Sequence, residues 1–261
     1  MQEQLTDLIV QRINEESVQL KQQFFNKHPF KVARHFALDK LLPQELAEKI
    51  YAEFAPLKQM RTLNSSGECK LKFMQLKNTS PLLQDLTFAI QDPKVVAAIE
   101  QITEIKDQQP DPKPAAGGVT MMPKGGFINP HLDNSHDVAK NLYRTVNLLY
   151  YVSPDWKEEN GGNFELWDEL VERAIVVPSL FNRLVVMETT PTSWHAVNPV
   201  RCESPRSCVF NYFFSEKSPK QHEYFHMTSF NARPEQKIRR VIVSAKRAIF
   251  NSVGKLFRNP D

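Results

Sequence analysis

Residues 115–215 constrain the fold most, because they consist of short apolar runs separated by turn signals. RTVNLLYYVS, NRLVVMET and RSCVFNYFFS are three of these runs, and glycine, proline and asparagine recur in the breaks between them. Short strands at such spacing are typical of a β-sandwich or barrel. The sequence therefore predicts a mainly β core over residues 115–218.

The run at residues 144–153 is apolar on both faces. Successive side chains of a strand point to opposite sides. One face carries Val146, Leu148 and Tyr150, and the other carries Thr145, Asn147, Leu149 and Tyr151. We expect one of these faces to line a barrel and the other to lie under helices.

Residues 1–114 are predicted to be mainly helical and to supply that cover. Apolar residues recur at helical spacing near the N-terminus, and Pro43, Ser80-Pro81 and Asp92-Pro93 each suit the start of a helix. The segment 70–76, KLKFMQL, is predicted to be a strand. This pattern indicates an elaboration packed on the β core, without a second domain.

Residues 219–261 form a C-terminal extension in which Pro234 opens a predicted amphipathic helix. The apolar stripe of this helix runs from Ile238 to Leu256, and seven basic side chains oppose the single acid Glu235. We expect the stripe to pack on the β core. The alternative is that the helix binds an anionic membrane surface or an acidic partner.

The composition excludes several classes of protein. With 41% hydrophobic and 24% charged residues the chain is expected to fold, and a net charge of +3 gives no reason to predict nucleic-acid binding. No apolar run reaches the roughly 20 residues of a membrane-spanning helix, and the N-terminus does not resemble a secretory signal. Three cysteines, Cys69, Cys202 and Cys208, argue against a disulfide framework, so we expect a cytoplasmic protein.

A metal site is predicted from PHLDN at residues 130–134. His131 and Asp133 are two residues apart on a predicted strand, so their side chains share one face. His195, in SWHAV near the end of the β region, is the candidate for a second histidine. Two histidines and one carboxylate on one side of a metal leave its other positions open, as non-haem Fe(II) oxygenases require.

Arg206 is the candidate for binding an anionic co-substrate. It opens the strand RSCVFNYFF, on which Arg206, Cys208, Phe210 and Tyr212 share a face. When 2-oxoglutarate chelates iron through its keto acid end, its other carboxylate lies deeper in the barrel. A buried carboxylate needs a cation, and the planar guanidinium of arginine can bind it through two hydrogen bonds.

HLD at 131–133, His195 and Arg206 together resemble the 2-oxoglutarate and Fe(II) oxygenase superfamily, in its prolyl-4-hydroxylase-like branch. The resemblance covers about 117–215 and includes GG-x-F-E-L at 161–166 and FNRLVVMETTPTSWHAVNPV at 181–200. It implies an α+β chain with a double-stranded β-helix (jelly-roll) core. It also implies that Tyr151 helps Arg206 to bind 2-oxoglutarate, with Asn147 as a further candidate.

The family resemblance implies Fe(II), 2-oxoglutarate and O2 as reactants, and it admits ascorbate as a reductant. The expected reaction hydroxylates an unactivated C–H bond while 2-oxoglutarate is decarboxylated to succinate. The substrate stays open between peptidyl proline, a small molecule and a sugar. Two departures from the family pattern are Cys208, where many relatives have serine, and Met121-Met122-Pro123, where oxygen-sensing prolyl hydroxylases have a tyrosine.

Two other functions compete with this interpretation. HEYFH at 222–226 matches the H-E-x-x-H helix of zinc peptidases, in which Glu223 would be the general base. A non-catalytic jelly-roll that binds a ligand is the other alternative. The identity of the metal and the turnover of 2-oxoglutarate would distinguish the three.

Overall fold

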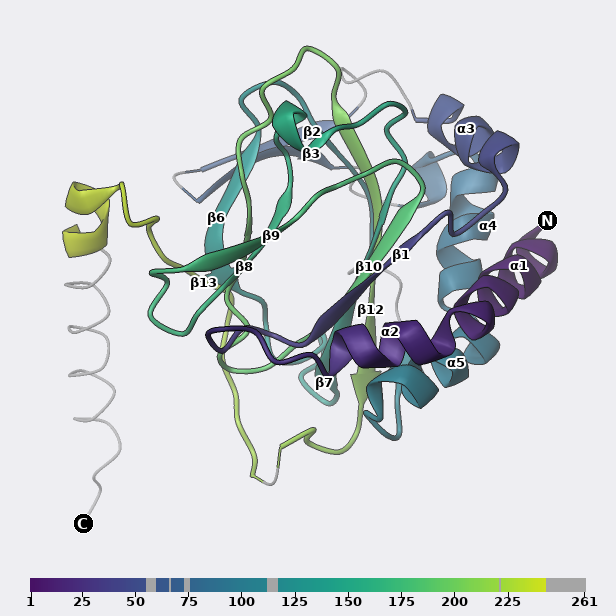
Figure 1. Cartoon of the computed structure of the whole chain (residues 1–261), viewed down its shortest axis with the longest axis horizontal. Helices are drawn as coiled ribbons and strands as arrows, with labels where there is room; N and C mark the ends of the chain where they lie inside the picture. The colour runs from purple at the N-terminus through teal and green to yellow at the C-terminus, as the bar shows by residue number, and fades with distance from the viewer. Residues whose placement is uncertain (55–59, 66, 73–75, 112–116, 221, 243–261) are drawn as a thin grey trace.

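The β core is a nearly closed antiparallel barrel, shown in Figure 1 for a computed structural model that describes residues 1–54, 60–65, 67–72, 76–111, 117–220 and 222–242. The strands follow one hydrogen-bonded path, β1-β10-β7-β12-β5-β3-β6-β11-β8-β9, and β13, β2 and β4 pair with β6, β3 and β12. The predicted fold, a jelly-roll with N-terminal helices in a mixed α+β chain, is confirmed.

The α-helices labelled in Figure 1 all lie in the first part of the chain, and most strands follow them. The strands are β1 (His35–Asp39), β2 (Arg61–Asn64), β3 (Glu68–Lys72), β4 (Gln109–Pro110), β5 (Gly118–Met122), β6 (Phe127–Leu132), β7 (Tyr143–Tyr151), β8 (Phe164–Trp167), β9 (Ala174–Val177), β10 (Arg183–Glu188), β11 (His195–Val197), β12 (Arg206–Ser215) and β13 (Ser229–Phe230). The helices are α1 (Gln2–Glu15), α2 (Ser17–Phe24), α3 (Gln44–Ala52), α4 (Pro81–Ile90) and α5 (Pro93–Thr103), with short 3-10 turns η2 (Leu76–Asn78) and η3 (Glu158–Asn160).

The N-terminal helices lie along one side of the barrel, outside β7, β10 and β12 (Figure 1). Helices α4 and α5 begin where the sequence predicts, because Ser80 and Asp92 accept hydrogen bonds from the backbone N–H groups of Leu83 and Lys94 at 3.3 and 2.9 Å. Pro43 is the residue that precedes the first helical residue of α3. The helices therefore cover the outer face of the sheet that carries β7.

Strand β7 sorts its side chains between the two sides of this sheet. Val146, Leu148 and Tyr150 belong to the core shared with the helices, whereas Leu149 and Tyr151 pack inside the barrel. The prediction for Thr145 is wrong, because its hydroxyl donates to Gln108 beside α5 and does not face the interior. The cause is a register irregularity between β7 and β12, where Phe213 pairs with Val146 but Phe214 pairs with Arg144.

Strand β3 joins the two halves of the barrel. Leu71 pairs with Met121 of β5, and Glu68 pairs with Ile128 of β6, both in antiparallel register. The predicted strand at 70–76 therefore exists as β3 up to Lys72, residues 73–75 lie outside the described part of the chain, and η2 follows. Strand β3 therefore bridges β5 and β6.

The C-terminal extension leaves β12 and pairs with β6 as β13, and its last described residues, 237–242, are helical. Ile238, Val241 and Ile242 are 81%, 70% and 50% exposed, so these three residues do not pack on the barrel as predicted. The rest of the predicted amphipathic helix, 243–258, lies outside the described residues. Among the helices that the structure describes, none has the length and apolar character needed to cross a bilayer.

Candidate active site

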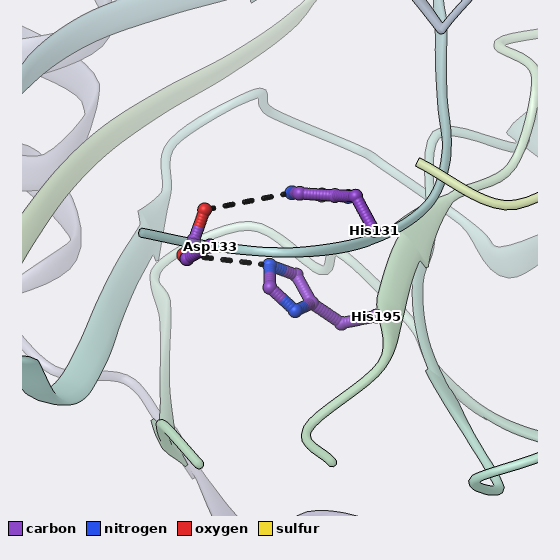
Figure 2. Close-up of side chains that lie close together, drawn as sticks. All are labelled: His131, Asp133 and His195. Carbon is purple, nitrogen blue, oxygen red and sulfur yellow. Dashed lines mark ion pairs between the residues drawn. The ribbon is translucent and has the colours of Figure 1, made fainter. Parts of the chain in front are cut away.

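His131, Asp133 and His195 meet at one point inside the barrel. His131 of β6 and His195 of β11 are directly paired residues of adjacent antiparallel strands, and their ring centroids lie 4.1 Å apart. Asp133 follows the end of β6, with its carboxylate oxygens 3.7 Å from His131 Nε2 and 3.6 Å from His195 Nε2 (Figure 2). One donor atom from each residue lies within 4.8 Å of the others, so a single metal ion can bind all three.

Both imidazoles are held by carbonyl groups of their own strands. His131 Nδ1 lies 3.0 Å from the carbonyl oxygen of Asn129, and His195 Nδ1 lies 2.9 Å from that of Ser193. A carbonyl accepts only from a protonated Nδ1, so both rings keep their Nε2 lone pairs for a metal. Burial, with His195 adding to it, lowers the pKa of His131 to about 3, which keeps this ring neutral.

The carboxylate of Asp133 is held by two side chains of β7. Asn147 Nδ2 donates to Asp133 Oδ2 at 2.7 Å, and Arg144 Nη1 lies 3.2 Å from the same oxygen. Burial alone would raise the pKa of Asp133, but the Arg144 charge, the two imidazoles and the Asn147 hydrogen bond together hold it well below its ordinary value. The carboxylate is therefore ionised and oriented toward the histidines.

Arg144 is a site residue that the sequence reasoning missed. It is 6% exposed, and its guanidinium carbon lies 3.8 Å from the centroid of the Tyr212 ring. Strict alternation along β7 would place Arg144 with Val146 on the helix-covered face. The register irregularity beside Thr145 turns it inward instead, and no sequence signal announces that irregularity.

Arg206 is a buried cation without a carboxylate. It opens β12, is 3% exposed, and its Nη1 donates to the sulfur of Met122 at 3.4 Å. Its Nε has no hydrogen-bond partner among the described residues, and none of the ion pairs in that part of the chain includes Arg206. A guanidinium buried in this way is stable when an anion binds beside it.

Two glycines of the GG-x-F-E-L segment make room for Arg206. Gly162 has φ +65°, and a Cβ there would lie 2.8 Å from Arg206 Cδ and 3.0 Å from Val200 Cγ2. Gly161 has φ +71°, and a Cβ there would overlap the carbonyl of Pro199. This turn therefore requires glycine for its backbone conformation and for the close approach of the arginine stem.

A single cavity connects the metal-binding residues with Arg206. It is lined by His131, Asp133, His195 and Arg206, and by Asn147, Leu149, Phe164, Cys208 and Phe210. The predicted shared face of Arg206, Cys208, Phe210 and Tyr212 is confirmed, because all four line this cavity. A metal ligand set and an unpaired cation thus face one cavity.

Residues 117–214, which hold all of these side chains, match the family described as 2OG-Fe(II) oxygenase superfamily. The part of the chain that holds the site therefore matches this superfamily. A curated relative is mouse prolyl 3-hydroxylase OGFOD1, 30% identical over 88 residues, which cover 31% of this chain and 16% of that protein. The similar segment therefore spans only a small part of that relative.

Solved structures share the fold of this chain. A prolyl 4-hydroxylase from Phytophthora capsici aligns with a TM-score of 0.57 and 18% identity, over 83% of this chain and 67% of that chain. HygX from Streptomyces hygroscopicus with nickel, 2-oxoglutarate and hygromycin B bound aligns with a TM-score of 0.51 and 11% identity, over 76% and 94%.

The residues fit the metal and co-substrate of the 2OG-Fe(II) oxygenase family. Two imidazole nitrogens and one carboxylate are the ligands that Fe(II) takes in such enzymes, and Arg206 provides the charge that the far carboxylate of 2-oxoglutarate needs. Fe(II) and 2-oxoglutarate are therefore the expected metal and co-substrate, held by His131, Asp133 and His195 and by Arg206.

The two residues predicted to assist Arg206, Tyr151 and Asn147, lie at different places in the site. Tyr151 is fully buried, with Arg206 Cζ 4.8 Å from its ring centroid, and burial raises its pKa to about 12. Its hydroxyl makes no hydrogen bond of normal geometry within the described residues. Asn147 contacts Asp133, so its visible role is to orient a metal ligand, and its contact with 2-oxoglutarate stays a prediction.

The zinc-peptidase alternative is wrong, because HEYFH is not a helix in this structure. Residues 222–226 form no regular element, and His222 and Glu223 are exposed. The segment is instead pinned to the chain beyond Asp133, where the backbone N–H of Ser135 donates to the His226 carbonyl at 3.0 Å. Without helical geometry the segment lacks the i, i+4 arrangement of a zinc-peptidase helix, and the described residues offer no metal cluster there.

Proposed function

We propose that this chain is an Fe(II)- and 2-oxoglutarate-dependent dioxygenase that hydroxylates an unactivated C–H bond. The balanced reaction consumes the substrate, 2-oxoglutarate and O2, and yields the hydroxylated substrate, succinate and CO2. The observation that carries the proposal is the unpaired, buried Arg206 in the same cavity as His131, Asp133 and His195. A binding module would need the metal ligands or the cation, but this reaction needs both.

Each group of the chain has a distinct task in this reaction. Bound Fe(II) supplies the redox chemistry that couples O2 to the decarboxylation of 2-oxoglutarate. Arg206 binds and orients the far carboxylate of the co-substrate, so that its keto acid end faces the three ligands. Asn147 and Arg144 keep Asp133 ionised and aligned, and Leu149 and Phe164 line the cavity with apolar surface that limits water.

Peptidyl proline is the first substrate class to test. Support comes from the local similarity to a prolyl 3-hydroxylase and from the fold shared with a prolyl 4-hydroxylase. The fold shared with HygX, which binds hygromycin B, supports small molecules as the second class. A panel of both kinds is therefore the appropriate screen.

The test is succinate formation by protein purified without oxygen and loaded with Fe(II). Supply of 2-oxoglutarate and O2 should give succinate, slowly without substrate and faster with one. His195→Ala should abolish the reaction, whereas His222→Ala, in the exposed HEYFH segment, should leave it unchanged. Metal binding without 2-oxoglutarate turnover in the presence of any substrate would favour a binding module and contradict the proposal.

A surface partner of the C-terminal segment is a separate proposal. The exposed Ile238, Val241 and Ile242 and the basic composition of 234–258 support binding to an anionic membrane surface. Full-length protein should sediment with anionic liposomes, whereas a chain that ends at Arg233 should not. Equal sedimentation of both chains would contradict this partner.

A further inference from the structure

The bridging strand β3 presents three charged side chains to the cavity side of the barrel. Lys72 pairs with Thr120 of β5, and Thr120 pairs in turn with Cys208 of β12. Thr120 and Cys208 both line the cavity, and directly paired residues share a face of the sheet. Lys72 therefore faces the cavity side, together with Lys70 and Glu68 at alternate positions, while Leu71 belongs to the core under the helices.

Lys72 has no anionic partner in the described part of the chain. Its side chain is half-buried, and its Nζ lies 5.0 Å from the centroid of Phe210, which lines the cavity. Its neighbour Lys70 is paired with Glu68 at 2.7 Å, so that carboxylate is already occupied. Burial, with the charges of Lys70 and Arg144 in the same direction and that of Glu68 opposing them, lowers the pKa of Lys72, and an anion bound beside Lys72 would stabilise its charged form.

The charges around the cavity do not balance, even when the metal and co-substrate are present. Lys70, Arg206 and Asp133 line the cavity, and Lys72, Arg144 and Glu68 lie beside these residues, which makes four cations against two carboxylates. The two positive charges of Fe(II) and the two negative charges of 2-oxoglutarate cancel each other. An excess of two positive charges therefore remains.

The excess lies away from the 2-oxoglutarate position. Arg206 pairs with Met122, whereas Lys72 pairs with Thr120, two residues further along β5. Arg206 is therefore the cation placed for the co-substrate, and Lys72 remains for a different anion. Because Lys70 already contacts Glu68, Lys72 is the stronger of the two β3 candidates.

We propose that the primary substrate carries a carboxylate or phosphate group that binds Lys72, assisted by Lys70, while its reacting C–H bond faces the metal. This inference rests on the proposed dioxygenase function and adds the charge of its substrate. A charge-assisted hydrogen bond of this kind is worth tenfold or more in affinity, by order of magnitude. Loss of the Lys72 charge is therefore expected to weaken substrate binding by about that factor.

Inorganic phosphate is the first probe, used with protein that holds Mn(II) and 2-oxoglutarate in place of the active metal complex. Phosphate bound at Lys72 lies near the paramagnetic ion, so its phosphorus nucleus should relax faster than in the presence of the Zn(II) form. Lys72→Gln should lose this enhancement by about tenfold. Lys217→Gln, which removes an exposed lysine paired with Asp107, is the control and should keep it.

The outcomes separate the two proposals. Enhancement that depends on Lys72 supports the anionic substrate, and its absence, or its persistence in Lys72→Gln, overturns it. If Mn(II) fails to bind wild-type protein, or binds His195→Ala equally well, the metal site itself is wrong, and the dioxygenase proposal falls first. Retained Mn(II) binding without phosphate enhancement overturns only the charge of the substrate.

Paired substrates then identify the source of the anion. Each pair consists of one candidate with a carboxylate or phosphate and the same molecule with an amide or hydroxyl, in a prolyl peptide series and in a small-molecule series. The charged members should stimulate succinate release, and Lys72→Gln should raise their KM about tenfold while the KM for 2-oxoglutarate stays constant. Equal stimulation by neutral members, or a changed KM for 2-oxoglutarate alone, would count against the inference.

Discussion

At the scale of the residue, the buried guanidinium of Arg206 lacks both an anionic partner and a hydrogen-bond acceptor for its Nε atom among the described residues. Asp133 and Lys70, which line the same cavity, each have a partner of opposite charge, whereas the guanidinium of Arg206 contacts the sulfur of Met122 and the ring of Tyr151. The free energy that it costs to bury this unpaired charge is recovered when the carboxylate of 2-oxoglutarate binds it. The loss of Arg206 should therefore change the affinity for 2-oxoglutarate.

Replacement of Arg206 should act on 2-oxoglutarate and spare the metal. Arg206→Met should raise the KM for 2-oxoglutarate by about tenfold or more, and Arg206→Lys by less, because lysine keeps the charge but loses the planar pair of donors. Succinate release at varied 2-oxoglutarate measures the change, and Mn(II) affinity serves as the control. An unchanged KM in Arg206→Met would contradict the assignment.

Removal of the Tyr151 hydroxyl should show whether it binds 2-oxoglutarate or stabilises the fold. Tyr151→Phe removes a buried hydroxyl that makes no normal hydrogen bond, so the unliganded protein should keep its melting temperature or gain slightly. If the hydroxyl donates to bound 2-oxoglutarate, the KM for 2-oxoglutarate should rise by about fivefold. A fall in melting temperature with constant KM would show that the hydroxyl serves the fold.

The site residues that could be predicted from the sequence are those placed by the alternation of a single strand or required by the charge of the co-substrate. His131 and Asp133 follow from alternation on β6, and Arg206 follows from the charge of a buried carboxylate. Arg144 could not be predicted, since its direction depends on an irregularity between β7 and β12 that involves residues far apart in the sequence. Lys72 was likewise hidden, because its neighbours come from β5 and β12.

At the scale of the element, the turn before β8 controls the position of Arg206. Gly162→Ala introduces a Cβ against the arginine stem and a positive φ that alanine adopts at a cost. We expect a loss of about 1–3 kcal/mol of stability and a higher KM for 2-oxoglutarate. Gly125→Ala is the matched control, because it has φ +79° but open space around the added Cβ. It should lose stability without a change in KM.

The segment after β13 is fastened to the outer face of β8 by a buried ion pair. Arg233 Nη1 donates to Glu165 Oε2 at 2.6 Å, and Trp167 Nε1 donates to the same oxygen at 3.1 Å. Both charged side chains are less than 10% exposed. Removal of one partner leaves an uncompensated charge in the interior.

Arg233→Met should therefore destabilise the protein by about 3–5 kcal/mol, measured by urea unfolding. The double variant Arg233→Met/Glu165→Gln should recover part of that loss, because the remaining amide carries no charge. Arg173→Met, which removes an arginine that is 63% exposed beside Asp168, should cost less than about 1 kcal/mol. Equal losses in the two single variants would show that burial of the Arg233 pair has no effect.

Capping residues predicted the starts of helices correctly, whereas the HEYFH motif wrongly suggested a zinc-binding helix. Ser80-Pro81 and Asp92-Pro93 carry their own capping groups, so α4 and α5 start as expected. HEYFH has the letters of a zinc helix but lacks helical context, and its backbone bonds to residues some ninety positions earlier. Contacts of that kind are invisible to a reading of the sequence in short windows.

At the scale of the whole molecule, two neutral histidines make stability depend on pH. Burial lowers the pKa of His35 to about 4 and that of His131 to about 3. Because these values lie below the ordinary 6.5, the unfolded chain binds more protons between them, and stability is lost as the pH falls through this window. Above pH 6.5 the contribution is fully present.

The metal-free protein should thus lose up to about 1.4 kcal/mol per pH unit for each histidine below pH 6.5. Urea unfolding between pH 7.5 and 4.5 measures the slope. His35→Gln should reduce the slope, and His222→Gln, on an exposed segment, should leave it unchanged. A stability that is constant over this range would contradict the neutral state of both histidines.

The fold class of the whole molecule could be predicted from the sequence, but the pairing of its strands could not. Regular short strands and an N-terminal helical segment indicated a covered jelly-roll. The bridge that β3 makes between β5 and β6, and the path of β13 across β6, are pairings between distant segments. They follow from the closure of the barrel, which no local pattern expresses.

The contacts of Asp133 affect whether the metal-free protein stays folded. Asp133 follows β6, whereas Arg144 and Asn147 belong to β7, so one carboxylate ties opposite walls of the barrel before any metal arrives. Both imidazoles are likewise aligned by their own strands. An iron-free population should therefore remain folded as a reservoir, ready to be loaded when the metal becomes available, and exchange of the ion should be a reversible change of composition without a change of shape.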